Sequence, residues 1–171
     1  MSNKIWEFTG DTKICFGITL RRIRAAVEFK LKCGIVIAKG ELGGWIEKES
    51  NLSGNAWVCG NAKVCGDAKV YGDAEVYGNA KVYGNAWVYG DAWVSGNAKV
   101  KSSKDYCVYK NTWSSFRWFT YTRSNKMWKV GCFYGTGAEL IAKAYKDSEK
   151  SGKCYEAIVK AQEAIEKAME A

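Results

Sequence analysis

The chain has 171 residues, of which 47% are hydrophobic and 14% aromatic, a composition that supports a folded core and excludes wholesale disorder. Its seven cysteines are odd in number, no Cys-x-x-Cys occurs and histidine is absent, which disfavours a disulfide framework or a zinc ribbon. The net charge is +8, with six Lys or Arg against one Asp in residues 102–136, so either an anionic partner or simple solubility is indicated.

The sequence also indicates where the protein is located and which residues make its turns. No segment has the apolar core of a signal peptide or the length of a membrane span, so we expect a cytoplasmic protein with reduced thiols and no membrane contact. Proline is absent, so Gly and Asn or Asp must make the turns. We predict no metal and no cofactor.

Residues 1–40 are predicted to form a β-rich N-terminal cap. The stretches KIWEF, TKICF and TLRRIRAAVEF alternate or run apolar, as strands do, and TGD at 9–11 is predicted to break them. A basic cluster of Arg21, Arg22 and Arg24 lies within the last stretch. It is interpreted either as the polar side of a strand or as a phosphate contact.

Residues 41–101 contain a repeat with a period of six. Eight hexads run without a break from Ser53 to Val100, for example CGNAKV and YGDAWV, and the degenerate ELGGWI and EKESNL precede them. The valine is β-branched and would point inward, the alanine is small, and Gly followed by Asn or Asp tolerates the left-handed backbone of a corner. Three hexads then close a triangular coil of 18 residues, and coils stack about 4.8 Å apart.

This pattern resembles the hexapeptide-repeat left-handed parallel β-helix family, with the variation that glycine follows the valine by two positions. The resemblance covers about residues 41–100 and implies a mainly β protein with a left-handed helix of about three coils. Because similar proteins are commonly trimers, it also implies a homotrimer. The combination of repeat and flanks resembles uncharacterised bacteriophage-encoded proteins, which would place the chain in the host bacterial cytoplasm.

The outward positions of the repeat differ from face to face. One face carries a lysine ladder of Lys63, Lys81 and Lys99, interpreted as an anion site or as a solvated face whose lysine stems cover neighbouring rungs. Outward aromatic residues usually mark an interface, and those predicted to contact other subunits are Trp57, Trp87 and Trp93.

Residues 102–171 are predicted to form a β-hairpin and two α-helices. FRWFTYTR (116–123) and MWKVGCFY (127–134) are separated by SNK, which can turn. Aromatic residues interleaved with Arg and Lys suit base stacking and phosphate binding, although they could instead pack the hairpin on a helix. The candidate ligand residues are Arg117, Trp118, Tyr121, Arg123, Lys126 and Trp128. A capping box, TGAE (136–139), predicts one helix to about Lys146, and a second covers roughly Tyr155–Met169.

Catalytic motifs are missing from the sequence. Acyltransferases and carbonic anhydrases that resemble this fold depend on histidine, and this chain has none. We therefore predict a non-enzymatic multimeric protein that binds a small anion, a nucleotide rather than extended nucleic acid. The phage resemblance favours a sponge that sequesters a nucleotide signal of bacterial immunity. The alternatives are a structural or protein-binding trimer of a virion or scaffold and, more weakly, an acyltransferase-like enzyme with an unusual base.

Overall fold

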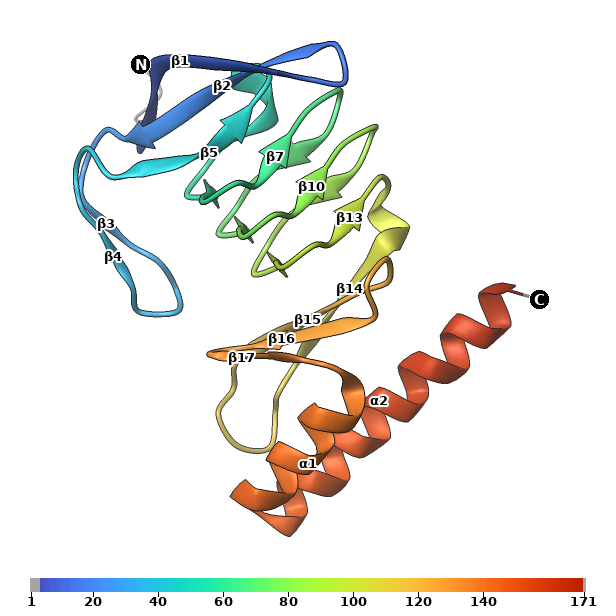
Figure 1. The fold of residues 1–171 in the computed structure, drawn as a ribbon. Helices are drawn as coiled ribbons and strands as arrows, with labels where there is room; N and C mark the ends of the chain where they lie inside the picture. Colours follow the sequence, from blue (N-terminus) through green and yellow to red (C-terminus); the bar gives the residue numbers. More distant parts are fainter. Residues whose placement is uncertain (1–3, 171) are drawn as a thin grey trace.

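A β-solenoid of about three coils forms the centre of the computed structural model, which describes residues 4–170 (Figure 1). Its short strands are β6 (Trp57–Val58), β7 (Lys63–Val64), β8 (Lys69–Val70), β9 (Glu75–Val76), β10 (Lys81–Val82), β11 (Trp87–Val88), β12 (Trp93–Val94) and β13 (Lys99–Val100). Partner strands are parallel and lie 18 residues apart, as in the pairing of Lys63 with Lys81 and of Lys81 with Lys99. The predicted 18-residue coil is confirmed.

The coils have three sheet faces around one core. The first face contains β7, β10 and β13, the second contains β6, β9 and β12, and the third contains β8 and β11. The alanines and valines of the eight hexads are fully buried, from Ala56 and Val58 to Ala98 and Val100. Small and β-branched residues thus fill the narrow interior of the coil at every rung, where larger side chains would overpack it.

A long hairpin caps the N-terminal end of the solenoid. Strand β1 (Trp6–Cys15) pairs antiparallel with β2 (Ile18–Ala25), and β2 pairs antiparallel with β5 (Leu42–Ile46), which extends the first face to the order β1-β2-β5-β7-β10-β13. The predicted break at TGD is wrong, because β1 continues through it with a register shift between Phe8 and Thr12. Gly10, at φ +97°, absorbs this irregularity.

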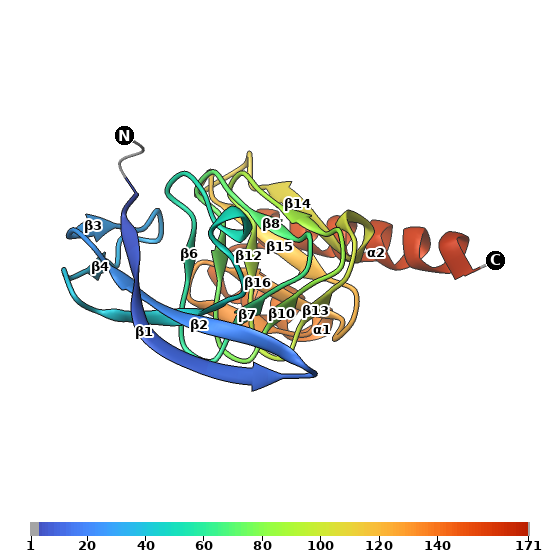
Figure 2. The ribbon, with the colours of Figure 1, turned by 90° about the horizontal axis from the view of Figure 1, so that it is seen from above.

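Residues 27–40 form a separate arm, which we call the β3–β4 arm. Its strands β3 (Phe29–Lys30) and β4 (Val36–Ile37) pair only with each other, and Figure 2 shows them to one side of the solenoid beside β6. Phe29 packs edge to face on Trp57, with ring centroids 5.2 Å apart. Lys32 forms ion pairs with Asp73 at 2.9 Å and Asp91 at 2.5 Å, which tie the arm to two successive coils.

The C-terminal part adds a sheet and two helices. In place of the predicted hairpin there is a four-stranded antiparallel sheet of β14 (Tyr106–Lys110), β15 (Trp118–Thr122), β16 (Met127–Val130) and β17 (Phe133–Gly135). Short 3-10 helices, η1 (Glu49–Asn51) and η2 (Ser103–Asp105), lie at either end of the solenoid. The predicted helices are present as α1 (Gly137–Asp147) and α2 (Glu149–Glu170), although α2 starts earlier than expected.

The four-stranded sheet is sandwiched between the solenoid and the helices (Figure 1). Tyr106 and Val108 pack against the solenoid core, and the Trp93 amide donates to Thr120 Oγ1 at 2.9 Å. The opposite face, with Phe119 and Tyr121, packs on the helices. The sheet therefore closes the C-terminal end of the coil, whose strand edges would otherwise be exposed.

Residues 4–170 contain the α-helices α1 and α2, and neither is long and apolar enough to cross a membrane.

Candidate functional site

A column of outward side chains runs down the first face of the solenoid. Trp45 pairs in register with Lys63, Lys63 with Lys81, and Lys81 with Lys99, each 18 residues from the next. Because in-register parallel strands place like positions about 4.8 Å apart, three ammonium groups are held within reach of one another. The lysines of the predicted ladder therefore share one face, and an aromatic ring stands at its head.

Two further cations come from the N-terminal hairpin. Arg22 on β2 lies opposite Trp45, with its guanidinium 5.4 Å from the ring centroid. Lys13 on β1 places its ammonium 3.8 Å from the centroid of the same ring. Burial, together with the charges of Lys63 and Arg22, lowers the pKa of Lys13. We call the set of Lys13, Arg22, Lys63, Lys81 and Lys99 the basic face. Trp45 lies at its head, beside Lys13, Arg22 and Lys63.

Among the residues that the structure describes, the cations of the basic face have no carboxylate partner. Within residues 4–170 none of the five forms an ion pair, whereas Arg24, Lys32, Lys48 and Arg123 each do. Clustered cations without counterions attract anions, and a bound anion would offset the repulsion from Lys63 and Arg22 that adds to the effect of burial on the pKa of Lys13. The arrangement is suited to a ligand with several negative charges.

Metal binding and nucleophilic chemistry find little support in the described residues around these cations. In the part of the chain that the structure describes, no three His, Cys, Asp or Glu side chains are grouped so as to hold a metal ion. The nearest thiol with a shifted pKa is Cys65, where burial and Glu47 raise the pKa and so disfavour the nucleophilic thiolate. What the residues of this face offer chemically is charge.

The predicted arginine cluster at the N-terminus is divided among three environments. Arg22 joins the basic face, as described. Arg21 lies over the ring of Phe8, 5.3 Å from its centroid, and Arg24 donates to Glu7 at 2.7 Å. Two of these three side chains are thus engaged within the cap.

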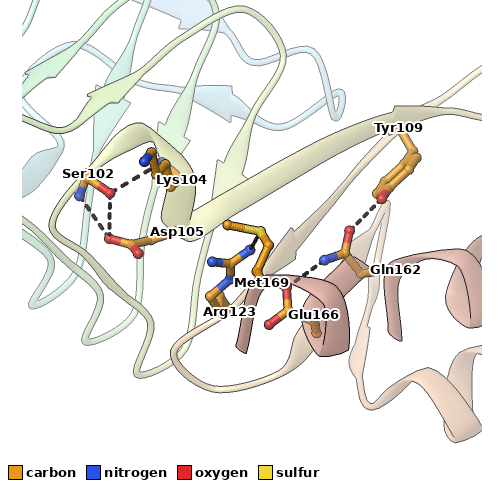
Figure 3. Close-up of polar contacts among 8 residues, drawn as sticks. All are labelled: Ser102, Lys104, Asp105, Tyr109, Arg123, Gln162, Glu166 and Met169. Atoms are coloured by element: carbon orange, nitrogen blue, oxygen red, sulfur yellow. Dashed lines mark hydrogen bonds and ion pairs between the residues drawn. The ribbon is translucent and has the colours of Figure 1, made fainter. Parts of the chain in front are cut away.

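The predicted C-terminal ligand residues do not form one surface. Tyr121 and Trp128 are 5% and 2% exposed because the register of β15 and β16 turns both rings toward the helices. Arg123 Nε donates to Glu166 Oε1 at 3.0 Å, and Gln162 donates to the same oxygen at 2.7 Å (Figure 3). These contacts dock α2 and leave neither ring open to a ligand.

The remaining members of that group are exposed but apart. Arg117 and Trp118 lie at the start of β15, whereas Lys126 lies in the turn after its end. Lys110 approaches Trp118, with its ammonium 5.2 Å from the ring centroid. A strand of five residues separates the two ends, a distance too great for one small ligand to span easily.

The three tryptophans predicted at a subunit interface also differ. Trp57 is 1% exposed, because the β3–β4 arm of the same chain covers it, so its ring is not a surface for another subunit. Trp93 is half-buried, with the Lys129 ammonium 5.6 Å from its centroid. Trp87 is exposed on the third face, where it lines an open pocket of about 330 Å³ with Lys48, Asp67 and Lys69.

Sequence reasoning missed two residues of the basic face. Trp45 stands 18 residues before Lys63 in the degenerate hexad ELGGWI, so extending the face assignment by one coil would have found it. Lys13 had no such signal, because its position depends on the register shift in β1 and on how the hairpin crosses the solenoid.

Comparisons with protein-family models, with curated proteins and with solved structures find no match.

Proposed function

We propose that the protein is a non-enzymatic binding protein whose basic face holds a small ligand carrying several phosphate groups. The observation that supports this most is a column of five cations without ion-pair partners in residues 4–170: Lys13 and Arg22 lie at the Trp45 ring, and Lys63, Lys81 and Lys99 follow on successive rungs. Phosphate oxygens accept charge-assisted hydrogen bonds from Arg and Lys, and such bonds are roughly twice as strong as neutral ones. The rigid spacing of the rungs fixes the backbone positions of the lysines, so binding has to order side chains and not the chain that carries them.

A nucleotide is the ligand class that we favour. It combines the negative charge that the cations require with a planar base that suits a site with aromatic residues. A non-catalytic protein that binds a nucleotide tightly would sequester it. The left-handed hexapeptide pattern and its resemblance to bacteriophage-encoded proteins extend the proposal to a phage sponge for a nucleotide signal of bacterial immunity.

A thermal-shift screen against linear and cyclic nucleotides, at low and moderate salt, tests the proposal. A ligand that binds the folded state at a hundredfold excess over its Kd stabilises it by about 2.7 kcal/mol. We expect the variant Lys63→Gln, Lys81→Gln, Lys99→Gln to weaken binding at least tenfold, because each lost charged contact is worth about 1.5–3 kcal/mol.

The matched control is Lys143→Gln, Lys146→Gln, Lys150→Gln, which removes the same charge from exposed positions on the two helices. It should retain binding apart from a small loss of long-range attraction. Equal losses of nucleotide affinity in the two triple variants would mean that binding depends only on the net charge of the protein. No stabilisation of the parent protein by any nucleotide would remove the proposal.

A structural or protein-binding role is the second candidate. The third face of the solenoid supports it, since Tyr71, Trp87 and Tyr89 form an aromatic strip there, with Tyr71 and Tyr89 stacked at 5.3 Å between centroids. Exposed apolar patches of this kind commonly mark protein contacts.

A further inference from the structure

The turn between β1 and β2 has an unexpected residue. Cys15 pairs with Ile18, so Phe16 and Gly17 alone make the turn, and both have positive φ, +52° and +77°. Two-residue turns with φ > 0 at both positions favour Asn-Gly or Gly-Gly, because a side chain with a bulky Cβ substituent is strained in that region. Folding alone would favour asparagine or glycine at the first turn position, yet the chain has phenylalanine there.

Packing does not compensate for this strain. Phe16 is 89% exposed, and Ile14, on the same hairpin, is 78% exposed. The contact that the structure gives the Phe16 ring is with the basic face, since the Lys81 ammonium lies 5.2 Å from its centroid. The turn therefore holds an open aromatic ring beside the lysine ladder. Strained residues without a folding benefit are often retained for function.

Other aromatic residues near the ladder are less suited to stacking. Trp45 is half-buried, and Lys13 and Arg22 both approach its ring. Its contribution is to position these cations. Phe16 has a free face and lies farther down the column, level with the second rung of lysines.

We propose that Phe16 stacks on the planar ring of the bound ligand while Lys63 and Lys81 hold its phosphates. This inference rests on the proposed function and narrows it, because it assigns to the site phosphorylated ligands with a heteroaromatic ring and disfavours inorganic polyphosphate and sugar phosphates. Stacking of a base on an aromatic side chain is tolerant of base identity, so Phe16 would select the class of ligand and not the particular base.

Ile14 provides the matched control. In the regular ladder at the end of the hairpin, Lys13 and Cys15 alternate with Ile14, so Ile14 points to the side of the hairpin opposite that of Lys13. Removal of its side chain deletes another largely exposed apolar group from the same hairpin without touching the basic face.

The experiment is calorimetric titration of Phe16→Asn, Phe16→Tyr, Ile14→Ser and Lys81→Gln with ATP, cyclic di-AMP and inorganic tripolyphosphate. We expect Phe16→Asn to lower the affinity for the tighter-binding of the two nucleotides about five- to hundredfold, which is the range of one stacking contact. The affinity for tripolyphosphate should change less than about twofold. Phe16→Tyr should retain affinity. Phe16→Asn should also raise the melting temperature, because asparagine relieves the turn. Ile14→Ser should leave all affinities unchanged.

Each contrary result has one meaning. If Phe16→Asn leaves nucleotide affinity unchanged while Lys81→Gln lowers it, the role of Phe16 is wrong and the basic face stands. If the parent protein binds neither nucleotide nor tripolyphosphate, both proposals are wrong. If Phe16→Asn and Ile14→Ser alter oligomer mass or binding to anionic vesicles equally, with no selective effect on nucleotide affinity, the hairpin tip is a protein or lipid contact and the inference is overturned.

Discussion

Glu75 stands between Trp57 and Trp93 on the second face of the solenoid and is 7% exposed. Burial raises the pKa of its carboxyl group to about 7, while Lys129 and the Cys33 thiol of the arm act in the opposite direction. One carboxyl oxygen, the Trp57 indole nitrogen and the Tyr77 hydroxyl are the buried side-chain polar atoms without a hydrogen-bond partner in residues 4–170. The fold thus tolerates a carboxyl group that is easier to bury neutral than charged.

Stability should therefore fall as pH rises past the unfolded pKa of this group. The folded pKa of about 7 exceeds the ordinary 4.5, so the folded state retains a proton that the unfolded state loses between these values. The contribution of this group to the free energy of unfolding is fully present below pH 4.5. It declines between pH 4.5 and pH 7 by roughly 3 kcal/mol, at about 1.36 kcal/mol per pH unit. Urea unfolding of the parent and Glu75→Gln at pH 4.5 and 8 isolates the effect, because other titrations are shared. Parallel pH profiles for the two proteins would contradict it.

At the scale of elements, the corner glycines test how closely the coils are stacked. Gly72 and Gly90 occupy equivalent corners one coil apart, with φ of +74° and +66°. A Cβ at Gly72 would lie 3.1 Å from the Gly90 amide nitrogen, whereas a Cβ at Gly90 would meet nothing within 4 Å. Only the first substitution strains the neighbouring coil as well as its own backbone.

We expect Gly90→Ala to lower the free energy of unfolding by about 1–2 kcal/mol, the usual penalty for an L-residue in the left-handed region. Gly72→Ala should cost at least about 1 kcal/mol more, because the next coil must shift. Chemical denaturation at one pH measures both. Equal losses would show that the coils separate freely enough to accept the added methyl group.

The elements differ in how far the sequence predicts them, and periodicity explains the difference. In the solenoid every outward residue shares a face with the residue 18 positions away, so the column of Lys63, Lys81 and Lys99 followed from spacing alone. In the C-terminal sheet the alternation along β15 was visible, but the side that is buried depends on where α2 packs. The alternation therefore predicts Tyr121 and Trp128 on a ligand surface, whereas the structure places them in the core between the sheet and the helices.

The β3–β4 arm shows the same limit. Its two strands of two residues each carry no periodic signal, and such a short hairpin is marginal by itself. Its position is set by contacts to distant residues, the ring of Trp57 and the carboxylates of Asp73 and Asp91. The repeat predicts that the Trp57 side chain points outward, but it does not predict which other segment of the chain covers that face.

For the whole molecule, the three faces of the solenoid are covered to different extents. The N-terminal hairpin borders the first face, and the arm and Lys129 cover much of the second. The third face retains the aromatic strip of Tyr71, Trp87 and Tyr89, with Trp87 48% and Tyr89 50% exposed. If the protein forms the homotrimer that its resemblance to hexapeptide-repeat proteins implies, this exposed strip offers apolar surface for the subunit contact.

Loss of the third-face aromatic residues should disrupt that assembly. The double variant Trp87→Ser, Tyr89→Ser should shift the oligomer toward a monomer of about 19.0 kDa, because it removes two large apolar groups from the interface while both outward positions leave the valine core intact. Light scattering after size-exclusion chromatography measures the mass. Trp118→Ser, which removes an exposed tryptophan from the C-terminal sheet, is the control and should leave the mass unchanged. A parent protein that is monomeric at all concentrations, or a double variant that keeps the parent mass, would exclude the third face as the interface and leave the basic face as the one surface with a proposed partner.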